Sequence, residues 1–318
     1  MNINFISYLN PFIHHGGGEQ ITSTLITEGR NRGHRIKVVH IDPIKDEYNE
    51  NTDINILWDI YNCPEKFNRF ADEWINRVIK SPTPYIYGTG GYEDLCSLGT
   101  LPCMGEINTT NECTVRKDHD TFGPGGINRP FPVSCPVKRR AQLLTDARLC
   151  IFFSKQHRDL TEQMVGPLNS LVAMPPITGL EKFKDEGKFR DIDLVSYGGH
   201  LEYKGFFNIK EAFPDRDVHF IGDGPTALPQ IYKFGKILGK VPLDVMPQFL
   251  NRVRTFVHMP RWPEPFGMTT LQAALCGCEV IENENSNVLK GWDLPDLVEE
   301  TKRWVNCEPI WEEIELYA

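Results

Sequence analysis

The sequence lacks any long hydrophobic run. Nowhere do eighteen consecutive apolar residues occur, and the first eight residues form a strand-like stretch without a basic start. We therefore expect neither a transmembrane helix nor a signal peptide. Positive charge is also scarce, because the formal net charge is −9. This balance argues against a protein that coats nucleic acid or an anionic membrane, while leaving room for a local basic patch.

Close cysteine pairs are missing as well. The nine cysteines include no Cys-x-x-Cys pair, and such an odd, scattered set fits a reducing cytoplasm better than a disulfide framework. Four of them could hold zinc, but their spacings of 7, 10 and 22 residues lack the close pairs of zinc ribbons. We therefore favour buried or free thiols over a metal site. These four weak candidates are Cys96, Cys103, Cys113 and Cys135.

Length and composition are those of an ordinary globular protein. A chain of 318 residues that is 40% hydrophobic and 24% charged suits two medium domains or one large one. Its first forty residues predict a strand at 4–8, a glycine-rich loop at 14–20, a helix at 21–32 and a strand at 35–41. This is a βαβ unit, and the loop after its first strand is where such sheets bind ligands. On spacing alone, three glycines are first of all a flexible turn.

The alternation of strand and helix continues through the first half. Strands are predicted at 54–58 and 85–87, with an amphipathic helix at 64–79 between them. A glycine-rich loop follows the second of these strands and opens a long, irregular, cysteine-bearing segment at 88–136. A segment of this length inside a compact domain is usually functional or disordered.

A basic helix is predicted next, at 137–148, and it leads into a further strand. We interpret the charges of its Lys-Arg-Arg cluster as a solvated face; contact with an anionic ligand or a membrane surface is the alternative. Ser154 is expected to cap a helix that runs to Val165. A Pro-Pro pair and the charged stretch 181–191 then indicate a linker between domains.

The second half restarts the same alternation. Its strands are short, rich in β-branched residues and bounded by glycine, as in parallel sheets covered by helices. The predicted strands are 194–197, 218–221 and 255–259, and the predicted helices are 243–253, 294–304 and 310–316.

The most informative stretch is residues 261–281, where a buried strand leads through a Pro/Gly turn into a helix that closes at Gly277. Such a turn leaves the first helical N–H groups unpaired at the strand ends, where a phosphate would bind. Glu264 precedes the helix and Gln272 lies eight residues further on, so both could face one ligand. The alternative is that Glu264 caps the helix and Gln272 is solvated.

The run Glu264-Pro265-Phe266-Gly267, a small-residue helix and Val-Ile after it resemble the signature loop of the retaining GT-B glycosyltransferases, which include glycogen and sucrose synthases. Three further motifs are similar to motifs of that superfamily: Gly-Gly-x-Glu at 16–19, the Lys-Gly pair at 204–205 and Gly-x-Gly-Pro at 222–225. The resemblance implies an α/β protein of GT-B type, with two Rossmann-like domains whose parallel sheets face a central cleft.

The resemblance also implies domain boundaries. Residues 1–176 would form the acceptor-binding domain, whose insert at 88–136 would shape the acceptor pocket. Residues 177–304 would form the nucleotide-sugar domain, and 305–318 would be a helix that returns to the first domain.

Roles for individual residues follow from the matched motifs. Lys204 would bind the donor diphosphate and Glu264 the sugar hydroxyls, and these two carry catalysis. Gln272 stands where the family has a Glu that binds ribose, and His200 stands where it has a phosphate-binding Arg, a charge that Arg261 could restore. The backbone contacts to the donor would come from Gly17, Gly18, Phe266, Gly267, Met268 and Thr269.

One family feature has no counterpart. Many members carry a His-Asp pair after the strand at 85–87, whose His touches the donor sugar, and here Tyr92-Glu93-Asp94 occupies the nearest matching stretch. No catalytic histidine is therefore assigned.

The sequence thus predicts a cytoplasmic, metal-independent transferase without cofactor, which moves a sugar from a nucleotide-diphosphate donor with retention of configuration. The acceptor is left open between a glycan, a lipid-linked sugar, a small molecule and a nucleic acid, with peripheral membrane contact as a further expectation. Three rivals remain: a nucleotide-sugar epimerase, a degenerate nucleotide-sugar or glycan-binding protein, and a phage-type nucleic-acid glycosyltransferase.

Overall fold

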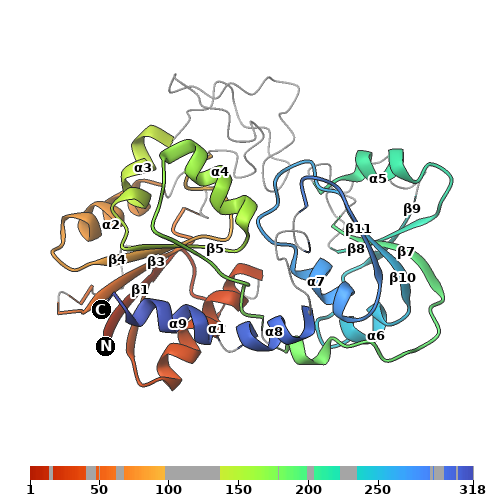
Figure 1. Cartoon of the computed structure of the whole chain (residues 1–318), viewed down its shortest axis with the longest axis horizontal. Helices are drawn as coiled ribbons and strands as arrows, with labels where there is room; N and C mark the ends of the chain where they lie inside the picture. The colour runs from red at the N-terminus through yellow and green to blue at the C-terminus, as the bar shows by residue number, and fades with distance from the viewer. Residues whose placement is uncertain are drawn as a thin grey trace.

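Two parallel β-sheets organise the chain (Figure 1). They are seen in a computed structural model that describes residues 1–13, 17–40, 48–49, 51–61, 68–96, 137–177, 179–198, 204–222, 235–286, 289, 297–305 and 307–317. The strand order is β2-β1-β3-β4-β5-β6 in the first sheet and β11-β10-β7-β8-β9 in the second. The predicted α/β architecture with two parallel sheets is confirmed.

The first sheet and its helices come from the first 172 residues. Its strands are β1 (Asn2–Ser7), β2 (Arg35–His40), β3 (Ile54–Trp58), β4 (Tyr85–Gly88), β5 (Leu149–Phe152) and β6 (Ser170–Val172). The helices of this half are α1 (Gly17–Asn31), α2 (Asn68–Lys80), α3 (Val137–Thr145) and α4 (Lys155–Val165). β1 lies between β2 and β3, so the strand that follows it in sequence lies on one side and the remaining strands lie on the other. In parallel sheets, ligands bind in the crevice at the carboxyl end of the strand where the order reverses in this way.

The second sheet repeats this plan. Its strands are β7 (Ile192–Tyr197), β8 (Val218–Ile221), β9 (Gly235–Gly239), β10 (Val253–His258) and β11 (Glu279–Glu282). Its helices are α5 (Phe206–Ala212), α6 (Met246–Leu250) and α7 (Met268–Leu275), and a 3₁₀ turn, η3 (Leu180–Lys182), precedes the sheet. Here β7 lies between β10 and β8, so the direction of winding again reverses at the first strand of the half.

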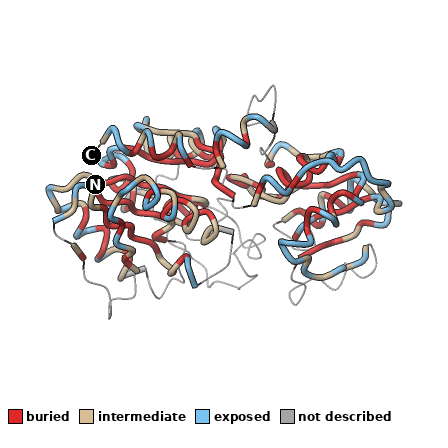
Figure 2. Tube along the Cα trace, turned by 90° about the horizontal axis from the view of Figure 1, so that it is seen from below, coloured by how far each residue is buried: buried red, intermediate tan, exposed pale blue. Residues whose placement is uncertain are grey.

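Buried residues occupy the inner parts of both halves of the chain (Figure 2), and each half contains a hydrophobic cluster of its own. All five residues of β3 are buried, which is expected for a central parallel strand covered by helices on either side. One hydrophobic cluster extends from β1 and α1 through Met174 and Ile177 to residues of the second sheet. The two halves therefore share packed side chains near the predicted linker.

The C-terminal helices join the halves. α8 (Leu297–Val305) lies between the two sheets, and α9 (Glu308–Glu315) lies beside α1, near both chain ends (Figure 1). The buried Trp311 donates its indole N–H to the carbonyl of Leu25 at 3.0 Å. Glu315 accepts from Arg32 at 3.0 Å and contacts His34 at 2.9 Å. These contacts fasten the last helix to the first half of the chain.

Several local predictions are confirmed and others are wrong. Ser154 caps α4 by accepting the N–H of His157 at 3.2 Å, as expected. The basic helix does not present only a solvated face: Arg140 is 4% exposed, donates to the carbonyls of Glu93 and Asp94, and stacks on Tyr61. The side chains of its two other basic residues lie outside the described residues.

The helix predicted at 243–253 is shorter, because α6 covers only Met246–Leu250 and β10 already begins at Val253. The glycines of the first loop are also placed differently, since α1 begins at Gly17 rather than at Ile21. No helix within the described parts of the chain is long and apolar enough to cross a membrane.

Candidate active site

Glu264 is the centre of a buried ionic cluster in the segment between β10 and α7. Its side chain is 9% exposed, and its Oε1 lies 2.5 Å from the Nζ of Lys204. Its Oε2 lies 2.9 Å from the Nε2 of His258, the last residue of β10. Burial by itself would raise the pKa of Glu264, but the charges of Lys204 and His258 outweigh this effect and lower it to about 2. The carboxylate is therefore ionised at neutral pH.

The backbone around Glu264 is held by the stretch after β11. The N–H of Glu264 donates to the carbonyl of Asn285 at 3.1 Å. The side-chain amides of Asn283 and Asn285 both donate to the carbonyl of Pro260, at 2.9 and 3.1 Å. The stretch after β11 thus fixes the loop that carries the carboxylate.

Lys204 reaches this cluster because the turn after it packs against the end of β10. Gly205 has φ +107, and a Cβ there would lie 1.9 Å from the carbonyl oxygen of Met259. Only glycine allows this approach. The side chain of Asn208 donates to the same carbonyl at 3.0 Å, which fixes the start of α5 beside the Glu264 segment.

The amino end of α7 opens beside Glu264. Its N-cap is Gly267, and no side chain of the described residues caps it. The first N–H groups of the helix are therefore available to an anion, and the helix dipole favours negative charge at this point. The alternative reading of this motif is wrong on both counts, because Glu264 does not cap the helix and Gln272 is only 4% exposed.

A cavity of about 170 Å³ separates this motif from the first half of the chain. Phe266 and Met268 form its wall on the second half, while Gly18 at the start of α1 and Asp59 after β3 lie on the opposite side. The remaining lining residues are Ile21, Gly90, Gly91, Glu93 and Phe153. The site is thus built by both halves of the chain.

An aromatic contact crosses the same boundary. The ring of Trp262, in the Glu264 segment, meets that of Tyr92 edge to face with centroids 6.4 Å apart. The ammonium of Lys204 lies 5.3 Å from the centroid of Trp262. Tyr92 in turn packs against the buried His157, whose Nε2 lies 2.9 Å from the carbonyl oxygen of Gly91. This chain of contacts links the Lys204 site to the loop after β4.

Acidic side chains gather on the first half of the cavity. Burial raises the pKa of Glu93 to about 8, with a further rise from Asp59. Burial also raises the pKa of Asp59 to about 7. The N–H of Gly90 donates to its Oδ1 at 2.6 Å, and this hydrogen bond offsets part of the rise. Burial also raises the pKa of the neighbouring Asp94, which does not line the cavity, to about 6. These carboxyls are therefore partly protonated near neutral pH.

The predicted site residues fall into three groups. Lys204 and Glu264 are in contact, and Gly18, Phe266 and Met268 line one cavity. The helix ends beside this cavity hold three more: Gly17 at the start of α1, and Gly267 and Thr269 at the start of α7. The run 264–267 lies between the last two, Arg261 and Gln272. His200, Cys103, Cys113 and Cys135 lie outside the described residues, and Cys96 is buried. The described residues contain no group of His, Cys, Asp or Glu that could hold a metal ion.

Sequence reasoning missed His258, Trp262 and Asp59. His258 was seen only as part of a strand, and Trp262 only as part of the motif. Asp59 had a usable signal, because it is the first polar residue after a buried central strand, and ligand sites lie at the carboxyl ends of such strands.

The sequence matches no protein-family model and no curated protein. Solved structures are similar to it in fold. The UDP-glucose complex of HepE from Anabaena aligns over 98% of this chain and 91% of its own, with a TM-score of 0.59 and 13% identity. AviGT4, a glycosyltransferase of avilamycin A biosynthesis, aligns over 99% and 96%, with a TM-score of 0.52 and 12% identity.

The fold is GT-B. Both similar structures align over nearly the whole length of this chain, so the likeness includes the two sheets together and is not limited to a single Rossmann-like half. The Glu264 cluster and the cavity between the halves occupy the crevice that this architecture forms at the carboxyl ends of its strands.

Proposed function

We propose that this protein is a glycosyltransferase that moves a sugar from a nucleotide-diphosphate donor to an acceptor, with retention of anomeric configuration. The observation that carries the proposal is the pair of the half-buried Lys204 and the buried Glu264 beside the open amino end of α7. Phe266 and Met268, which follow Glu264 closely in the chain, line a cavity whose far wall comes from the other half of the chain. A donor bound on one wall would thus face an acceptor held on the other.

The donor side supplies positive charge for the leaving group. When the bond between the anomeric carbon and the diphosphate breaks, negative charge develops on the phosphate oxygen. The ammonium of Lys204 and the first N–H groups of α7 are placed to stabilise it, because both are fixed before the reaction begins. The acceptor oxygen then bonds to the anomeric carbon, and its proton passes to the departing phosphate, so that no further protein base is needed.

Glu264 is suited to the sugar rather than to the phosphate. An ionised carboxylate accepts hydrogen bonds from hydroxyl groups but repels a diphosphate, and the low pKa of Glu264 keeps it ionised. Its ties to Lys204 and His258 fix its orientation. We assign the nucleotide ribose to Gln272, one turn inside α7, whose amide can pair with a diol without charge.

The donor is the first thing to identify. Because HepE has been crystallised with UDP-glucose, UDP-sugars head a panel that also contains GDP-, ADP- and TDP-sugars. Thermal shift and calorimetry should show saturable stabilisation by one donor class. Lys204→Met should abolish it, whereas Lys188→Met should not, because Lys188 forms an equivalent but exposed pair with Glu186.

A folded wild-type protein that binds none of these donors would contradict the proposal. Once a donor is known, the configuration of the product at its anomeric carbon, measured by NMR, tests retention. An inverted product would leave the transferase assignment in place but remove the proposed course of the reaction.

A further inference from the structure

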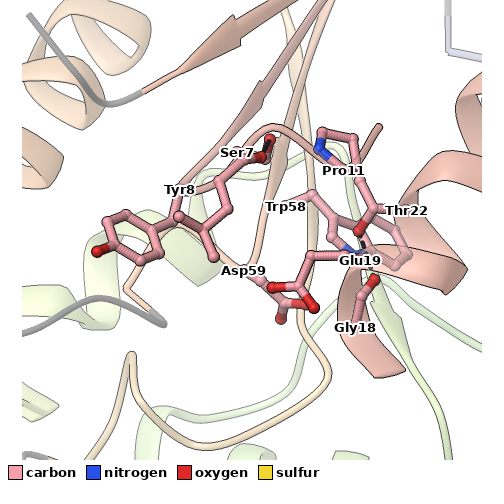
Figure 3. A pocket seen from close by; sticks show the side chains of 9 residues that line it. Ser7, Tyr8, Pro11, Gly18, Glu19, Thr22, Trp58 and Asp59 are labelled. Atoms are coloured by element: carbon pink, nitrogen blue, oxygen red, sulfur yellow. Dashed lines mark hydrogen bonds between the residues drawn. The ribbon is translucent and has the colours of Figure 1, made fainter. Parts of the chain in front are cut away.

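A second, much smaller cavity lies behind the first. Its volume is about 20 Å³, about the space that one water molecule or one hydroxyl group needs. Gly18 and Asp59 line both cavities, so the small one is a side chamber of the cleft. Figure 3 shows the side chains around it. The other lining residues are Ser7, Tyr8, Leu9, Pro11, Glu19, Thr22 and Trp58.

Trp58 brings an unused hydrogen-bond donor to this chamber. It is fully buried at the end of β3, and its Nε1 has no hydrogen-bond partner among the residues that the structure describes. The indole is fixed in place because it packs over Gly88, where a Cβ would lie 2.2 Å from the ring. A buried N–H normally has a hydrogen-bond acceptor, so we expect a ligand or a water molecule to supply one here.

The chamber also contains carboxylates, which need hydrogen-bond donors rather than acceptors. Asp59 has φ +47, an uncommon conformation for a residue other than glycine, and its Oδ1 accepts the N–H of Gly90. Its Oδ2 faces Gly18 and Gly90, at 3.5 Å from where a Cβ of either would stand. The carboxylate of Glu19 lies next to that of Asp59 in Figure 3. Both need hydrogen-bond donors when ionised.

The hydroxyl groups of Ser7 and Thr22 do not donate hydrogen bonds to these carboxylates. Ser7 donates its proton to the carbonyl of Leu9 at 2.9 Å, and Thr22 donates to the carbonyl of Gly18 at 2.8 Å. Each hydroxyl can therefore only accept a further hydrogen bond. Apart from Tyr8, and with the carboxyls ionised, the side chains of the chamber thus present one N–H donor, from Trp58, and several oxygen acceptors, in a space for a single small group.

A hydroxyl group matches this pattern, since its oxygen accepts from the indole while its proton goes to a carboxylate. An ammonium has no lone pair for Trp58, and a phosphate or carboxylate is too large for the chamber and is repelled by Asp59 and Glu19. Resting on the proposed function, we propose that the acceptor is an uncharged polyhydroxy compound, such as a sugar or a cyclitol. One of its hydroxyls occupies this chamber, and the rest of the molecule lies in the larger cavity.

Two conservative variants test the assignment. Trp58→Phe removes the N–H and keeps the ring, and Asp59→Asn keeps the shape in a backbone conformation that Asn tolerates well. Matched controls are Trp304→Phe in α8, where the indole donates to Glu300, and Asp193→Asn, an exposed partner of Arg216. If Trp58→Phe does not fold, Asp59→Asn carries the test alone.

The probes are methyl α-D-glucopyranoside and myo-inositol, compared with glucose 6-phosphate and glucuronate. Binding to the full chain with its donor nucleotide bound is followed by ligand-observed NMR. We expect a neutral probe to bind, and each site variant to weaken it about tenfold, the effect of one lost hydrogen bond. Donor affinity, measured by calorimetry on the same samples, should be unchanged in all four variants.

Three outcomes would overturn the inference and leave the proposed function intact. In the first, the charged probes bind as tightly as the neutral ones, and in the second, no neutral probe binds although the donor does. In the third, the site variants bind the neutral probe as the wild type does, which would mean that the chamber holds only water. A wild-type protein that binds no donor overturns the proposed function and this inference with it.

Discussion

Removing the charge of Lys204 should destabilise the fold and abolish donor binding at once. Its ammonium lies 2.5 Å from a carboxylate whose side chain is 9% exposed, while the lysine itself is 22% exposed. At an effective dielectric constant of about 20, two unit charges about 4 Å apart attract by about 4 kcal/mol. Desolvation and partial exposure offset part of this attraction. We therefore expect Lys204→Met to lower the free energy of unfolding by about 2–3 kcal/mol.

A double-mutant cycle separates the pair from its surroundings. Glu264→Gln removes the second charge, so the double variant no longer buries an unpaired ion. We expect it to be about 2 kcal/mol more stable than the sum of the two single changes predicts. Urea unfolding at neutral pH measures the four proteins. Donor binding should stay absent in the double variant, because it requires both side chains.

The pH dependence gives the cycle a second readout. The pKa of Glu264 is about 2 in the folded protein, below its ordinary value of 4.5, so its stabilising effect is complete above pH 4.5 and is lost as the pH falls towards 2. The coupling should shrink over the same range. The exposed pair of Lys188 and Glu186 serves as control, with an expected coupling below about 0.5 kcal/mol. Additive effects at Lys204 and Glu264 would refute the reasoning.

Three further changes have expected outcomes. In urea unfolding, Gly205→Ala should lower the free energy of unfolding by at least about 2 kcal/mol more than Gly187→Ala. Both glycines have positive φ, but only at Gly205 would the added Cβ lie 1.9 Å from a carbonyl oxygen. Trp311→Ala should cost about 3–5 kcal/mol and expose α1 to hydrogen exchange; unchanged protection of α1 would contradict the docking of α9. Because the pKa of Asp59 and of Glu93 is raised to about 7 and 8 in the folded protein, their protonated forms stabilise it at low pH, and stability should fall as the pH rises from about 4 to 8. Asp59→Asn should flatten this slope in unfolding curves at several pH values, and an unchanged slope would contradict the assignment.

The sheets could be predicted because their strands are short apolar runs between glycines and polar residues. The predicted ends of β3 and β8 agree with the structure at every residue, because glycine or polar residues bound each strand on both sides. β9 was missed because Gly235–Gly239 holds only two apolar residues and lies at the edge of its sheet, where partial exposure weakens the pattern. Helix boundaries were less certain, as α6 shows, because the pattern of apolar residues does not say where a helix ends.

The candidate site could be predicted only in part. Lys204 and Glu264 lie 60 residues apart in the sequence, and no local pattern says that they touch; the motif resemblance placed both at the donor. Arg140 shows the opposite case. Its neighbours Lys138 and Arg139 suggested a solvated basic face, but its partners Glu93 and Tyr61 come from elsewhere in the fold. Such distant partners decide whether a charged side chain is buried or exposed, and the local pattern of charges in the sequence does not reveal them.

The positions of the site residues follow one rule of the architecture. Each sheet reverses its winding around its first strand, at β1 in one half and at β7 in the other. Gly18 follows β1 and Asp59 follows the neighbouring β3, while Lys204 follows β7 and Glu264 follows the neighbouring β10. One reversal therefore carries the pair of Lys204 and Glu264, and the other carries the acidic Asp59. On the proposed function, the side of Lys204 would select the leaving group, and the side of Asp59 would limit the acceptor to a molecule that can offer a hydroxyl without negative charge.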